Sequence, residues 1–135
     1  MTSGWEAALS GASSPSWTER VRAGRDLASF ADVPEAAEVL VGLLLDVEDT
    51  AVTRQTAKAL ARVGTVAAVR LIALAVVEAD GNQADWMQTG VHDGLMGSDG
   101  GPDVAAACVK LARDRDEAVR RGASEISAWT DGTRC

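Results

Sequence analysis

An approximate repeat of 33 residues is the feature of this chain that most constrains its fold. Residues at positions 24, 57, 90 and 123 are all small, and so are those at positions 28, 61, 94 and 127. Positions 30, 63, 96 and 129 are all apolar, and positions 32, 65, 98 and 131 all hold residues that favour a helix N-cap. Self-similarity at this spacing is typical of a solenoid, whose units bury their apolar sides against their neighbours.

Each repeat unit has the pattern of two helices. In the first unit, Gly24, Leu27 and Phe30 follow at a spacing of three residues, close to one helical face. Ser16 and Asp32 each precede a Glu by three residues, which predicts a capping box at the start of two helices. We therefore predict helices near residues 5–11, 17–30, 34–46, 50–63, 66–79, 84–96, 102–113 and 117–129.

These helices predict an all-α, single-domain protein that spans residues 1–135. The expected architecture is a short right-handed α-solenoid of antiparallel helix pairs, with about three and a half repeats. The pairs are expected over residues 16–48, 49–81 and 82–114, with a capping helix and loop at 1–15 and a C-terminal half repeat at 115–135. A plain helical bundle is the alternative architecture.

Residues 52–64 and 116–123 carry the strongest signature of a known family. The family pattern is an Asp followed by Val-Arg, a small residue and Leu, and Asp116, Val119 and Arg120 match its beginning. On these residues the chain resembles the short HEAT-like repeats, armadillo-like helical repeats that also occur in phycobilisome-lyase-type proteins. The resemblance implies a non-catalytic scaffold or adaptor that binds another protein, without naming that protein.

Charge and composition narrow the expected partner and compartment. The chain has 13 Lys and Arg against 20 Asp and Glu, a net charge of -7, which argues against binding to nucleic acid or to an anionic membrane. One His and two Cys provide no spacing typical of a metal site, so we expect no metal, no cofactor and no catalysis. The chain begins with no secretory signal, and we expect a bacterial cytoplasmic protein. The polar last helix predicts a monomer or a weak dimer.

Acidic residues gather in the turns between the expected helix pairs. Asp46, Glu48 and Asp49 form the clearest group, and they are candidate contacts for a basic protein partner. A negative edge of this kind steers a basic partner, although it is equally consistent with a solvated rim. The alternative function within this class is an acidic antidote or immunity-type protein that neutralises a basic toxin or nuclease.

The segment 85–96 is the most unusual part of the repeat array. It contains His92, the single histidine, and Trp86, which we expect to be an exposed anchor for a partner. Gly90 and Gly94 weaken a helix, which indicates either a decayed repeat or a mobile binding surface. The alternative from another class is a lyase-type enzyme, or an enzyme accessory, centred on this segment.

The second helix of each pair is expected to form the inner surface of the solenoid. Its candidate partner-binding residues are Glu35, Glu38, Arg70 and Asp103, which we expect to be exposed.

Overall fold

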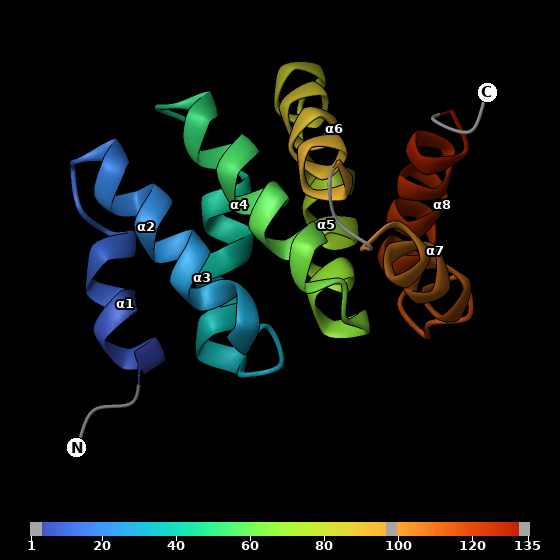
Figure 1. Ribbon diagram of the computed structural model, residues 1–135, viewed down its shortest axis with the longest axis horizontal. Coiled ribbons are helices and arrows are strands. Elements are labelled where there is room, and N and C mark those ends of the chain that lie inside the picture. Colours follow the sequence, from blue (N-terminus) through green and yellow to red (C-terminus); the bar gives the residue numbers. More distant parts are fainter. Residues whose placement is uncertain (1–3, 97–99, 133–135) are drawn as a thin grey trace.

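The computed structural model describes residues 4–96 and 100–132, and within them every regular element is a helix (Figure 1). The α-helices are α1 (Gly4–Ala12), α2 (Trp17–Leu27), α3 (Pro34–Leu44), α4 (Thr50–Val63), α5 (Val66–Glu78), α6 (Gly81–Leu95), α7 (Gly100–Leu111) and α8 (Glu117–Gly132). A short 3-10 helix, η1 (Ala28–Phe30), continues α2. The all-α class is therefore confirmed, and each predicted helix is present with its ends shifted by no more than three residues.

Local capping chemistry defines the ends of the central helices. The side chain of Asp49 accepts a hydrogen bond from the Ala51 amide at 2.9 Å, and the Thr65 hydroxyl accepts one from the Ala68 amide at 3.2 Å. Gly64 ends α4 with a φ of 66°, a left-handed conformation that glycine adopts without strain. These caps separate α4 and α5 into an antiparallel pair.

Two predicted capping boxes are wrong, and one was missed. The Ser16 hydroxyl pairs with the Thr18 hydroxyl at 2.8 Å and does not cap α2, while Val33, not Asp32, is the N-cap of α3. A capping box instead begins α6, where Asp80 and Gln83 exchange hydrogen bonds of 2.7 and 3.1 Å. This box starts α6 at Gly81, three residues before the predicted position.

The helices bury one main apolar core as the chain runs from α1 at one end to α7 and α8 at the other, and a smaller apolar cluster lies among α2, α3 and α4 (Figure 1). Along this direction α2 packs against α4 and α4 against α6, while α3 packs against α5. Leu27, Leu40, Leu60, Ile72 and Met87, from five successive helices, are each at most 1% exposed. Each helix therefore completes the core of its neighbours, as expected for a solenoid.

Glycines on α6 allow its unusually close contact with α4. A Cβ atom at Gly90 would overlap the Arg54 carbonyl oxygen, and one at Gly94 would lie 2.7 Å from the Lys58 carbonyl oxygen. The small residue Ala57 faces Gly90 across the same contact. These glycines therefore allow close helix packing. The sequence interpretations, a decayed repeat or a mobile binding surface, did not include this role.

The C-terminal end of the array packs differently from the rest. The first helices of the expected pairs, α2, α4 and α6, pack one against the next more extensively than against the second helix of their own pair. The last helix, α8, packs mainly against α5. Gly122 makes this possible, because a Cβ atom there would overlap the backbone of Ala73 on α5. The second helix of the second pair is therefore covered by α8 as well as by α7.

Trp129 and Cys108 both lie in the core. Trp129 is 8% exposed and Cys108 is 3% exposed, and both belong to the main apolar cluster. Burial raises the pKa of the Cys108 thiol, an effect that a hydrogen bond with Ser127 partly offsets. Cys135 lies outside the described residues. Among the described residues, no helix combines the length and the apolar character needed to cross a membrane.

Candidate protein-binding surfaces

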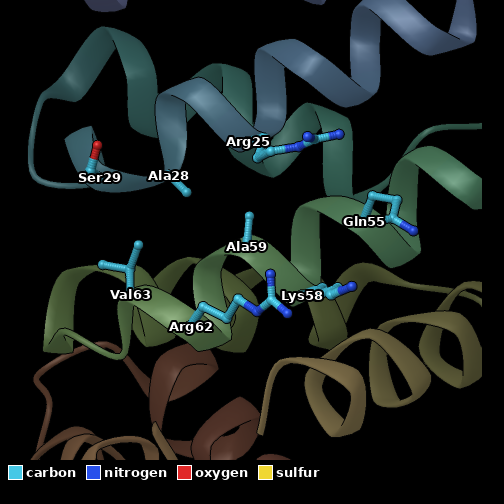
Figure 2. A pocket seen from close by; sticks show the side chains of 8 residues that line it. All are labelled: Arg25, Ala28, Ser29, Gln55, Lys58, Ala59, Arg62 and Val63. Carbon is cyan, nitrogen blue, oxygen red and sulfur yellow. The ribbon is translucent and has the colours of Figure 1, made fainter. Parts of the chain in front are cut away.

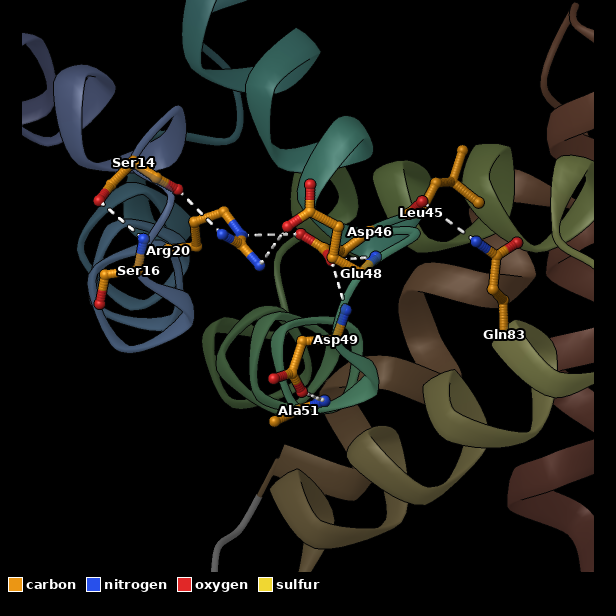
Figure 3. Close-up of polar contacts among 9 residues, drawn as sticks. All are labelled: Ser14, Ser16, Arg20, Leu45, Asp46, Glu48, Asp49, Ala51 and Gln83. Atoms are coloured by element: carbon orange, nitrogen blue, oxygen red, sulfur yellow. Dashed lines mark hydrogen bonds and ion pairs between the residues drawn. The ribbon is translucent and has the colours of Figure 1, made fainter.

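The acidic turn between α3 and α4 is part of a buried ion-pair network (Figure 3). Arg20 on α2 donates from Nε to the Asp46 carboxylate at 2.9 Å and from Nη1 to the Ser14 carbonyl at 2.9 Å. The second oxygen of Asp46 accepts from the amides of Glu48 and Asp49, at 2.9 and 2.8 Å. Both side chains of the Arg20–Asp46 pair are only 9% exposed. Together, Arg20 and Asp46 therefore tie α2 to the loop that precedes it and to the turn between α3 and α4.

Only one of the three predicted acidic contacts in this turn is largely exposed to solvent. Asp46 is used by the Arg20 network, and Asp49 caps α4. The side chain of Glu48 is 73% exposed, and its nearest cation is Arg20 at 3.8 Å. The turn therefore presents a single accessible carboxylate rather than a cluster of three.

A related ion pair joins α5 to the turn that follows α7. Arg70 donates to Asp114 at 3.2 Å, so this predicted surface residue is tied to a carboxylate. The Asp116 amide donates to the other oxygen of Asp114 at 2.9 Å. The bond from Asp116, followed by the one from Arg70, lowers the pKa of Asp114 below its usual value.

This pKa shift predicts how acid affects the folded protein. Because the pKa is lower in the folded chain, Asp114 stabilises the fold above its unfolded pKa of about 3.9, and this contribution is lost as the pH falls through the folded value. We expect Asp114→Asn to be less stable than the parent near pH ~6 and the difference to shrink toward pH ~2. Urea denaturation at several pH values measures it, and a difference that does not change with pH would contradict the assignment.

The segment 85–96 contacts α4 through the guanidinium of Arg54, which interacts with two side chains of the segment. Arg54 donates from Nε to Asp93 at 2.6 Å, and its guanidinium lies 5.8 Å from the centre of the Trp86 ring. The hydrogen bond and the charge of Asp93 raise the pKa of Arg54 above its ordinary value. Trp86 is half-buried rather than the exposed anchor expected, whereas Trp17 on α2 is 49% exposed.

His92 also has a polar contact within the fold. Its Nε2 atom lies 3.3 Å from the Trp129 carbonyl oxygen, across the contact between α6 and α8. In the part of the chain that the structure describes, no three His, Cys, Asp or Glu residues come together as a possible metal site. Trp86 and His92 thus lie in helix contacts, and the geometry of 85–96 supports no particular chemistry.

Of the remaining predicted contacts, three are exposed but dispersed, and Arg70 is half-buried. Glu35 and Glu38 lie on α3, while Asp103 lies on α7 beside Gly64 at the end of α4. Arg70, the fourth of these candidates, is on α5 and paired with Asp114. The structure places these four residues on three different helices.

A groove between α2 and α4 is a concave surface lined by cationic side chains (Figure 2). Its volume is about 380 Å³. The residues that line it are Arg25 on α2, Ala28 and Ser29 on η1, and Gln55, Lys58, Ala59, Arg62 and Val63 on α4. We refer to it as the α2–α4 groove. Sequence reasoning missed it, although Arg25 and Lys58 occupy equivalent positions in successive repeats.

The α2–α4 groove is cationic in an otherwise acidic protein. None of its lining residues is acidic, and Arg25, Lys58 and Arg62 form no ion pair with any residue in 4–96 or 100–132. The nearest carboxylate in sequence, Asp26, faces the other side of α2, where it lines a pocket between α1 and α2. The three cations are therefore available to a ligand.

Comparison with known proteins gives one finding about the first two repeats. A family model of HEAT repeats matches residues 5–83, which include both helices that form the α2–α4 groove. Comparisons with curated proteins and with solved structures found no match.

Proposed function

Because this chain belongs to the HEAT-repeat family, we propose that it is a protein-interaction module that binds its partner through the α2–α4 groove. HEAT repeats generally mediate protein–protein interaction. The observation that supports the choice of surface is the groove itself, which is concave and lined by polar side chains without partners in the described chain. Function in such a protein depends on the site, because the fold alone does not specify a partner.

The geometry favours this surface over the acidic turns. A basic partner, including a basic toxin or nuclease, would have to use Glu48 and other dispersed carboxylates, since Asp46 and Asp49 are bonded within the fold. Charge reversal of Glu48 is the informative test of that alternative. Reversal of Asp46 or Asp49 would disturb the network or the helix cap and so would not report on binding.

Photo-crosslinking from the groove tests the proposed surface. With p-benzoylphenylalanine in place of Ser29, an exposed residue of the groove, irradiation in a lysate of the source organism should give a covalent adduct of defined mass. The matched control carries the same group in place of Ala112, an exposed residue that follows α7. We expect no such adduct from position 112. Equal adducts from both positions, or none from position 29, would contradict the proposal.

A further inference from the structure

We infer that the α2–α4 groove binds an acidic segment of the partner protein, with side-chain carboxylates seated among Arg25, Lys58 and Arg62. This inference rests on the proposed function and specifies the chemistry of its site. It starts from a contrast among the cations of the same helices. Arg20 on α2 is paired with Asp46, and Arg54 on α4 with Asp93. The groove cations have no such carboxylate among the described residues.

The arrangement of the three cations suits an anion that comes from outside. Arg25 extends from α2, and Lys58 and Arg62 extend from the facing side of α4 (Figure 2). Lys58 and Arg62 are four residues apart on one helix, where like charges repel each other. A carboxylate between the two helices would remove this repulsion and accept charge-assisted hydrogen bonds, for which the planar fork of arginine is well shaped.

The rest of the lining fits a peptide better than a polyphosphate. The amide of Gln55 and the hydroxyl of Ser29 can bond a peptide backbone, while Ala28, Ala59 and Val63 offer apolar contact. A nucleic acid, by contrast, presents a long row of phosphates, and the lining of the groove has three cations to neutralise them. Three cations in one groove match a short acidic segment of a protein.

Fluorescence anisotropy with defined probes tests the inference on the full chain. The probes are a rhodamine-labelled peptide of ten Glu residues, the matching Lys peptide and a labelled oligo-dT of ten nucleotides. We expect the Glu peptide to bind at least about tenfold more tightly than either other probe, with an affinity that falls as salt is raised. Binding of oligo-dT as tight as that of the Glu peptide would overturn the inference in favour of a phosphate ligand.

Two triple variants with equal net charge locate the effect. Arg25→Gln with Lys58→Gln and Arg62→Gln should weaken binding of the Glu peptide by about tenfold or more. Lys110→Gln with Arg113→Gln and Arg115→Gln removes three exposed cations in and after α7 and should leave the affinity unchanged. Circular dichroism and thermal denaturation check that both variants fold.

Equal loss in the two variants would show a non-specific charge effect and overturn the inference. The proposed function fails separately, through the crosslinking result at position 29. An adduct there without binding of the Glu peptide would leave the groove as the interaction surface and exclude an acidic occupant.

Discussion

Replacement of Arg20 by Met is expected to lower the free energy of unfolding by about 3–5 kcal/mol. The guanidinium bonds both the Asp46 carboxylate and the Ser14 carbonyl, and its side chain is 9% exposed. Without it, Asp46 remains a largely buried charge with no cation, which is the costly outcome for a buried ion pair. The loss should exceed that from any exposed ion pair of the protein.

Urea denaturation measures this effect, and a neighbouring arginine supplies the control. Arg22 lies two residues along α2, is exposed and forms no ion pair with a described residue. Arg22→Met should change the free energy of unfolding by no more than about 0.5 kcal/mol. A loss in the Arg20 variant as small as that in the Arg22 variant would show that the network does not stabilise the fold.

Gly90→Ala is expected to destabilise the protein by about 1–3 kcal/mol, although alanine is the better helix former. A Cβ atom at position 90 would overlap the Arg54 carbonyl oxygen and lie 2.9 Å from the Ala57 Cβ. The first of these atoms belongs to the backbone of α4 and cannot rotate away. The two helices would have to separate, and the core beneath them would lose contacts.

Gly42 provides the matched control within a helix. It lies on α3, is exposed, and a Cβ atom there would meet nothing within 4 Å. Gly42→Ala should therefore stabilise the protein by up to ~1 kcal/mol, which is the gain in helix propensity alone. Thermal and urea denaturation of the two variants should give changes of opposite sign. A stabilised Gly90 variant would disprove the close contact between α4 and α6.

The helices were predictable because helix formation depends on neighbours in sequence. Hydrogen bonds within a helix join residues four apart, and caps act over two or three residues, as at Asp49 and Thr65. The capping boxes predicted at Ser16 and Asp32 failed because a hydroxyl or carboxylate near a helix start has several possible partners. The Ser16 hydroxyl bonds the Thr18 hydroxyl instead, and the N-cap of α3 is Val33, one residue after Asp32.

The candidate surfaces were much less predictable, because the availability of a charge depends on distant residues. Arg20 and Arg25 lie on the same helix and look alike in sequence. Only the folded chain brings Asp46, 26 residues away, to the first and leaves the second facing a groove without carboxylates. The same reason explains why Trp86, taken for an exposed anchor, is half-buried beneath Arg54.

The sequence by itself determined that this protein is a series of amphipathic helices with small residues recurring every 33 positions. Those small residues permit close contact between helices, but they do not identify the neighbouring helix. Sequence periodicity shows which face of a helix is buried, and it does not show which helix covers that face. Only the tertiary structure decided that α6 lies against α4, that α8 lies against α5, and which cations remain without a carboxylate. These choices depend on packing and charge between residues at least 26 positions apart, beyond the range of any local pattern.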